Sequence, residues 1–338
     1  MAHANDACVS LPRSRALAAF AGLALAACSL ASGAALAQGY PDNSRILKFS
    51  VPSGPGSTVD LLARAFERAL PAVTGIKAVV ENKPGADAVI GVQAFLQTPA
   101  DGYNALFVSS SFVAVSPAIL PDLPYDPLKD LQPIASISRA GLVMNLGVST
   151  PFRTMREFVA AAKAQPGKYT CATASTTQTL ACEFLQASAG VKLLVVPYRT
   201  TAAAMLAVST GEADSIFVDP GSAIAQWGSG RVRGVVSTTP ERQAALPDMP
   251  TTKEEGFPDF QMIAWFAIFA KAGTPPEAAA GLREIMRKAA QRPEVQSVLK
   301  TFVHEPTDLG VAELAKLNAD EIAALKKLIK DHNISFTR

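Results

Sequence analysis

Short apolar runs alternate along the chain with segments whose apolar residues recur every three to four positions. The runs are typical of strands, and the recurring pattern is typical of helices that pack one face on a core. The predicted strands are residues 45–51, 77–81, 105–109, 132–138, 142–148, 193–197, 214–218, 232–237 and 265–270. The predicted helices are residues 58–72, 89–97, 154–163, 177–189, 201–210, 222–227, 275–292, 293–300 and 310–333. This alternation predicts a largely parallel α/β architecture.

The N-terminal segment is typical of an export signal. After Arg13 and Arg15, residues 16–38 carry no charge and are mostly small or apolar. That layout matches a secretory signal peptide. We expect cleavage after Ala37, which makes residues 1–37 the signal peptide. The alternatives are lipidation of Cys28, which ends a lipobox-like sequence, and an uncleaved membrane anchor.

Length and composition indicate a globular protein of two domains. The chain has 338 residues, of which 49% are hydrophobic and 18% charged, enough to bury a sizeable core. The formal net charge is +2, and the sequence has no charge run of the kind that binds nucleic acid. Long-range attraction of an anion would therefore be weak, so any anion must be recognised by local groups.

The cysteines and histidines narrow the chemistry. Export would leave Cys171 and Cys182 as a pair in an oxidising compartment, so we predict a disulfide between them, with two buried free thiols as the alternative. His304 and His332 stand apart from other metal-ligand residues, and we expect both on the surface of the C-terminal helices. No metal-binding or nucleophile motif is recognisable. We therefore expect no catalytic residue, no metal and no cofactor.

The loop "VPSGPGSTVD", residues 51–60, joins a predicted strand to a predicted helix. Ser57 and Asp60 have the spacing of a capping box, which leaves backbone N–H groups at the helix start free to bind an anion. The nucleotide motifs fail, because Ser57 follows Gly56 where a phosphate-binding loop needs lysine, and Val59 occupies a glycine position of the dinucleotide fingerprint. A carboxylate fits as well as a phosphate, and a plain turn is the alternative.

Three further loops share this chemistry at predicted strand ends. They are residues 109–111, 172–179 and 218–222, all rich in hydroxyl groups or glycine. Ligands of open α/β sheets bind outside the carboxyl ends of strands, so the four loops predict one pocket for a small polar anion. The candidate binding residues are Ser53, Gly54, Pro55, Gly56, Ser57, Thr58, Asp60, Ser109, Ser110, Ser111, Thr173, Ser175, Thr176, Thr177, Gln178 and Asp219. Solvated loops, with Asp219 as a turn cap, are the alternative.

An ordered series of segments resembles a known family. The opening "YPDNSRILKFSVPSGPGSTVDLLARAF" resembles the mature start of the Bug family, the extracytoplasmic solute-binding receptors of tripartite tricarboxylate transporters. "VVENKPGADAVIGVQAF", "TPADGYNALFVSSS", "LPYDPLKDLQPIASI", "VPYRTTAAAMLAVSTGEAD", "ERQAALPDMPTTKEEGFPDF" and "WFAIFAKAGTPPE" resemble later family segments in the same order. The first loop has fewer consecutive glycines than the family pattern, and the second has more hydroxyl groups. These departures concern ligand identity rather than fold.

The resemblance implies an α/β fold of the type II periplasmic-binding-protein kind, with two lobes and a ligand cleft between them. It implies a lobe one of residues 38–138 plus 263–338 and a lobe two of residues 139–262. The implied ligand is a small carboxylate, held by the first loop of lobe one and by the hydroxyl-rich loop of lobe two. The family positions fall on Gly54, Gly56, Ser57, Thr58 and Asp60, and on Ser175, Thr176, Thr177 and Gln178.

We therefore expect a monomeric periplasmic receptor that captures a small carboxylate for an inner-membrane permease. The alternative is a sensor or scaffold that signals to a partner protein without transport. An enzyme on the same fold is disfavoured, because no candidate nucleophile has a recognisable general base.

Overall fold

The computed structural model describes residues 40–120, 122–331 and 334, and the fold below is that of the unit that begins at Asn43. The predicted signal peptide, the Cys28 alternative and His332 lie outside the described residues. None of the described helices is both long enough and apolar enough to cross a bilayer.

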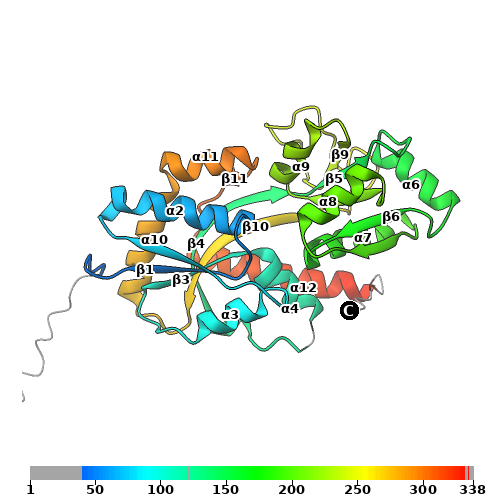
Figure 1. Ribbon diagram of the computed structural model, residues 1–338. Helices are drawn as coiled ribbons and strands as arrows, with labels where there is room; N and C mark the ends of the chain where they lie inside the picture. The colour runs from blue at the N-terminus through cyan, green and yellow to red at the C-terminus, as the bar shows by residue number, and fades with distance from the viewer. Residues whose placement is uncertain (1–39, 121, 332–333, 335–338) are drawn as a thin grey trace, which may run out of the picture. The chain divides into compact units, whose positions relative to one another are not determined.

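The first lobe is built on a six-stranded sheet with the order β11-β4-β10-β3-β1-β2 (Figure 1). Its strands are β1 Leu47–Val51, β2 Ala78–Asn82, β3 Asn104–Ser109, β4 Leu131–Gly141, β10 Ile263–Lys271 and β11 Glu305–Pro306. β1 pairs in parallel with β2 and β3, whereas β10 runs antiparallel to β3 and β4. The parallel strands bring their carboxyl ends to one edge of the sheet.

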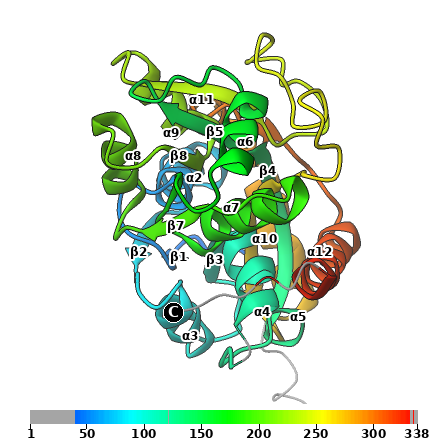
Figure 2. The ribbon, with the colours of Figure 1, turned by 90° about the vertical axis from the view of Figure 1, so that its right-hand side faces the viewer.

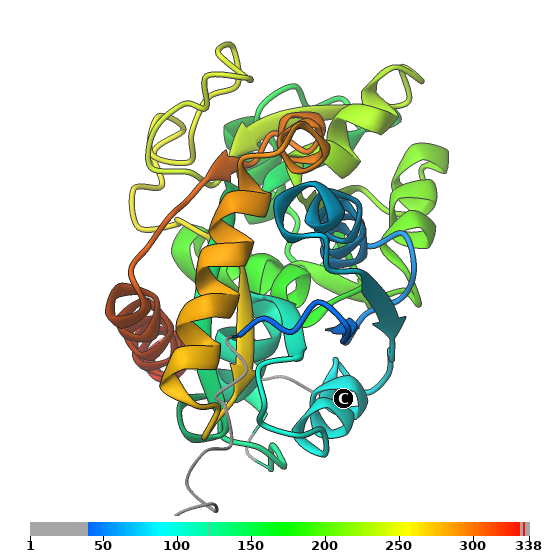
Figure 3. The ribbon, with the colours of Figure 1, turned by 90° about the vertical axis from the view of Figure 1, so that its left-hand side faces the viewer.

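Helices of the first lobe come from both ends of the described chain. They are α2 Thr58–Thr74, α3 Val89–Leu96, α4 Ser116–Ile119, α5 Pro127–Asp130, α10 Pro276–Ala290, α11 Pro293–Thr301 and α12 Val311–Asp331, with a π-helical turn η1 at Ser111–Val115. α2 begins at the predicted cap, because Ser57 Oγ accepts a hydrogen bond from the Asp60 N–H. α2 packs against α10 and α11, which lie beside it in Figure 3, and its buried residues include Leu62 and Phe66.

The second lobe has a five-stranded sheet with the order β7-β6-β8-β5-β9. Its strands are β5 Val143–Gly147, β6 Thr170–Thr173, β7 Leu194–Pro197, β8 Ser215–Val218 and β9 Val232–Ser237. Its helices are α6 Met155–Ala164, α7 Thr176–Ala189, α8 Thr201–Thr210 and α9 Pro220–Trp227. β6 pairs in parallel with β7 and β8, whereas β5 runs antiparallel to β8 and β9.

Two long strands connect the lobes. β4 leads through Leu142 into β5, and β10 returns from the second lobe along nearly the full length of β4. The predicted lobe boundaries, 138/139 and 262/263, fall inside β4 and immediately before β10; they stay predictions. The expected largely parallel architecture is wrong in part, because each sheet is mixed. A return strand that pairs with its outgoing neighbour must run antiparallel to it, and residue periodicity carries no strand direction.

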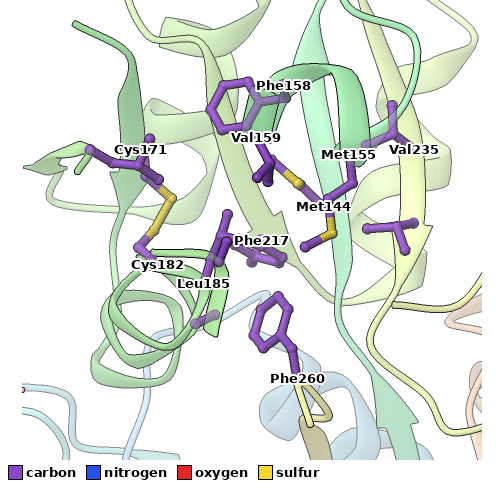
Figure 4. Close-up of a cluster of buried hydrophobic side chains, with 14 of the residues drawn as sticks. Met144, Met155, Phe158, Val159, Cys171, Cys182, Leu185, Phe217, Val235 and Phe260 are labelled. Carbon is purple, nitrogen blue, oxygen red and sulfur yellow. A yellow bond between two sulfur atoms is a disulfide. The ribbon is translucent and has the colours of Figure 1, made fainter. Parts of the chain in front are cut away.

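The second lobe is centred on an apolar cluster that includes the predicted disulfide (Figure 4). Cys171 on β6 is bonded to Cys182 on α7, as predicted, and both residues are buried. Phe158, Phe217 and Phe260 fill the space between the sheet and helices α6 and α7. The disulfide therefore links the middle of α7 to β6, the strand that precedes the hydroxyl-rich loop.

The double replacement Cys171→Ala/Cys182→Ala is expected to lower the free energy of unfolding by about 2–3 kcal/mol, because an unlinked chain gains conformational freedom when it unfolds. Urea unfolding in an oxidising buffer measures the loss. The wild type in a strong reductant should approach the stability of the double variant. Equal stability of the oxidised wild type and the double variant would contradict a stabilising disulfide.

Candidate functional site

The carboxyl ends of four strands lie in two neighbouring pairs, one pair in each lobe. β1 and β3 are parallel neighbours in the first sheet, and β6 and β8 are parallel neighbours in the second. Across the boundary, Ser111 Oγ lies 2.5 Å from Thr177 Oγ1, so the two hydroxyl groups share a hydrogen bond. The loops after these strands, with the first residues of the helices α2 and α7, are called the four corners below: residues 52–59, 109–111, 173–177 and 218–221. Parallel pairing thus places the first two corners side by side in one lobe and the last two side by side in the other. The contact between Ser111 and Thr177 joins one corner of each pair across the boundary.

The first corner is held by Asp60, whose carboxylate is buried. It accepts hydrogen bonds from the Gly56 N–H at 2.8 Å, Asn82 Nδ2 at 2.9 Å and Arg64 Nε at 3.1 Å. Burial raises the pKa of Asp60, but the hydrogen bonds from Gly56, Asn82 and Arg64 outweigh burial and leave that pKa below its ordinary value. Gly56 has φ +82°, a conformation that favours glycine. The structure therefore uses Asp60 to shape the loop, and its carboxylate is already engaged.

Free backbone donors remain at the two helix starts. Within the part of the chain that the structure describes, the N–H groups of Thr58 and Val59 on α2 have no acceptor, and neither do those of Thr176 and Thr177 on α7. The first N–H groups of a helix lack intrahelical partners and lie at its positive end. The start of α2 in the first lobe and the start of α7 in the second therefore each offer N–H donors to an anion.

The hydroxyl-rich corner is also braced from within. Ser175 caps α7 by accepting from the Gln178 N–H at 3.3 Å. The Gln178 side chain accepts from the Ala174 N–H at 2.6 Å and donates to Thr201 Oγ1 at 3.3 Å. Thr173 is buried, and its carbonyl accepts from the Tyr198 N–H at 2.7 Å. Gln178 and Thr173 thus support the corner, whereas Thr176 and Thr177 present its donors.

Most of the remaining predicted site residues form hydrogen bonds within the protein. Asp219 caps α9, because its carboxylate accepts from the N–H and the hydroxyl of Ser222 at 3.0 and 2.7 Å. Ser110 Oγ is buried and accepts from the Trp265 N–H at 3.4 Å, and Ser109 is buried at the end of β3. Ser53 and Ser57 share a hydrogen bond at 2.7 Å between their hydroxyl groups, and Gly54, Pro55 and Gly56 form the rim of the first corner.

A cavity of about 250 Å³ opens beside the corners, between the two lobes. Ser110 and Thr177 line it, so it adjoins the predicted loops of residues 109–111 and 172–179. α12 contributes Glu321, whose carboxylate accepts a hydrogen bond from Trp265 Nε1. Burial raises the pKa of Glu321 to about 7, and the hydrogen bond from Trp265 offsets burial only in part. The sequence analysis missed Glu321, because an acid on an amphipathic helix has no local pattern that distinguishes it from a surface charge.

His304 is a second residue that the sequence analysis misplaced. It was expected at the surface, but it is buried after α11, with Nδ1 3.0 Å from Ser138 Oγ and its ring 4.7 Å from that of Phe266. Burial lowers the pKa of His304 to about 4, although the charge of Asp219 acts in the opposite direction. Its Nε2 is buried with no hydrogen-bond partner in the described chain. The apolar neighbours come from β10 and the end of α11, which only the fold brings together.

The described residues include no group of three or more His, Cys, Asp or Glu side chains that could hold a metal ion. The corner loops themselves contain no lysine or arginine. Chemically, the corners can therefore bind an anion through N–H and hydroxyl donors.

A family of known proteins and individual relatives resemble this chain in sequence. A family model described as "Tripartite tricarboxylate transporter family receptor" matches residues 62–334. Protein BugT of Bordetella pertussis is 29% identical over 295 residues, which cover 86% of this chain and 90% of BugT.

Solved structures share the fold. One described as a periplasmic transporter is 30% identical, with a TM-score of 0.80 over 88% of this chain and 99% of that chain. Periplasmic binding protein BugD is 25% identical, with a TM-score of 0.79 over the same shares. R. palustris Rpa4515, solved with adipate, is 24% identical, with a TM-score of 0.81 over 88% of this chain and 99% of that chain; this last likeness concerns the fold.

Proposed function

The chain belongs to the tripartite tricarboxylate transporter receptor family, and on that premise we propose that its four corners bind a small carboxylate. The family resemblance and the two-lobed α/β fold expected from the sequence are confirmed, and the family is one of solute-binding receptors rather than enzymes. The residues that hold the ligand, and the ligand itself, are the subject of the proposal.

The contact between Ser111 and Thr177 is the observation that carries this proposal. It joins the end of β3 to the start of α7, so donors from both lobes stand within reach of one small molecule. Hydrogen bonds to a charged group contribute about 1.5–3 kcal/mol each. Several such bonds supply the ~8 kcal/mol of micromolar binding and offset part of the desolvation of a carboxylate without an arginine. Because the donors are divided between lobes, the ligand favours their closed arrangement.

Thr177→Val is expected to weaken binding of the best-bound acid about tenfold, because the substitution keeps the shape of the side chain and removes one hydroxyl group from the lobe boundary. The matched control is Thr179→Val on the same helix, whose hydroxyl donates to the Ser175 carbonyl at 3.2 Å. The control should change affinity less than threefold. A thermal-shift screen of mono- and dicarboxylates finds the acid, and calorimetry gives the affinities. Equal effects of the two substitutions would remove Thr177 from the site.

We further propose that the protein is exported to the periplasm and delivers its ligand to an inner-membrane permease as a monomer. Support comes from the uncharged N-terminal segment and from relatives described as periplasmic. Cleavage after Ala37 is the proposed route, with lipidation at Cys28 as the alternative.

A further inference from the structure

Residues of both lobes line the cavity beside the corners. Figure 2 shows α7 of the second lobe and α12 of the first, which both contribute lining residues. η1 and α7 meet next to it, and α12 packs against η1 and α4. Ser110 and Thr177 belong to both the corners and the cavity wall. A ligand whose carboxylate is bound at the corners can therefore extend into this space without leaving the lobe boundary.

The wall of the cavity is mostly apolar. Leu180 and Phe184 of α7 line one side, and Leu325 and Leu328 of α12 line another. Apolar surface of this kind binds hydrocarbon favourably, because each methylene group that enters it is removed from water. The wall therefore suits the carbon chain of a ligand.

The charged groups of the wall are acids. Glu321 and Asp259 line the cavity, and none of the described residues that line it is Lys, Arg or His. Glu321 is partly buried, and the indole N–H of Trp265 is the donor to its carboxylate. A second carboxylate on the ligand would meet two acids of like charge and no cation among the described lining residues. Repulsion by the partly buried Glu321 is less screened by water than repulsion by the exposed Asp259.

Resting on the proposed function, we propose that this cavity is an extension of the ligand site that receives the apolar chain of a monocarboxylate. Glu321 and Asp259 exclude a second carboxylate at the distal end. The protein is thus a receptor for acids with one carboxylate and an apolar body, rather than for dicarboxylates.

Hexanoate and adipate test this assignment, because they have the same carbon chain and differ only in the second carboxylate. Calorimetry at pH 8 should show hexanoate binding at least tenfold more tightly than adipate. Glu321→Gln should reduce that ratio at least threefold by improving adipate binding. The matched control, Asp320→Asn, removes the same charge from the exposed neighbouring position on α12 and should leave the ratio unchanged.

A larger side chain in the cavity distinguishes binding in the extension from binding at the corners. Ala324 lines the cavity from α12, and Ala324→Leu should weaken hexanoate binding at least tenfold while leaving binding of propionate unchanged. Adipate binding as tightly as hexanoate, or hexanoate binding unaffected by Ala324→Leu, would overturn the extension while leaving carboxylate binding at the corners intact. Failure of all of these acids, propionate included, to bind would overturn the proposed function as well.

Discussion

Asp60→Ala is expected to lower the free energy of unfolding by about 3–4 kcal/mol, the largest effect of any single substitution considered. The buried carboxylate accepts three hydrogen bonds, from Gly56, Asn82 and Arg64. Its removal takes the acceptor from the Gly56 N–H and from the Asn82 amide at a partly buried site, and bonds to a charged group are the stronger kind. Arg64 is partly exposed and can turn to water, which limits the loss.

Urea unfolding at pH 7 measures this effect, and Glu284→Ala provides the control. Glu284 also accepts from an arginine, Arg287, but the pair is exposed, so its removal should change stability far less than Asp60→Ala does. Asp60→Ala should also weaken ligand binding, because the loop of residues 53–57 loses the bond that fixes Gly56. A stability loss equal to that of Glu284→Ala would show that Asp60 does not organise the loop.

Opposite pH dependences are expected from two variants, His304→Asn and Glu321→Gln. The folded-state pKa of His304 is lowered to about 4 by burial, so the unfolded chain binds its proton more readily. Its contribution to stability is therefore present above pH 6.5 and is lost as the pH falls toward 4. The pKa of Glu321 is raised to about 7 by burial, so the folded chain binds the proton more readily. Its contribution is present below pH 4.5 and is lost as the pH rises through 7.

The two contributions nearly cancel in the wild type between pH 5 and pH 7, and each variant removes one of them. Relative to the wild type, Glu321→Gln should lose about 2 kcal/mol of unfolding free energy when the pH falls from 7 to 5, because only the His304 contribution remains. His304→Asn should gain about 2 kcal/mol over the same interval, because only the Glu321 contribution remains. Asparagine retains a group that can bond to Ser138, and glutamine retains an acceptor for Trp265.

Urea midpoints at pH 5, 6 and 7 measure both slopes, and the difference between the two variants cancels every titration they share. If the urea midpoints of the two variants changed in parallel with pH, the opposite pKa shifts of His304 and Glu321 would be wrong.

Local chemistry along the chain is sufficient to predict the corners. Ser57 caps α2 at the predicted place, since a cap depends on residues three positions apart. Thr154 and Ser175 cap α6 and α7 with the same spacing. The positions of most strands and helices follow the apolar periodicity to within a few residues, because that pattern also depends on residues close together in the sequence. The elements that the periodicity did not predict are all short: the helical segment Ser111–Ile119, α5, β6 and β11. The segment Ser111–Ile119 packs against α12, which is distant in the sequence.

The family and the two-lobed fold were therefore determined by the sequence, through ordered segments whose meaning is local. Only the tertiary structure decided that β10 runs antiparallel and that Ser111 contacts Thr177. It also decided that Asp60 accepts hydrogen bonds within the protein, and that His304 and Glu321 have pKa values shifted by burial. These features depend on residues far apart in the chain. Strand direction, burial and electrostatic surroundings arise only when such residues pack together, so no local pattern carries them.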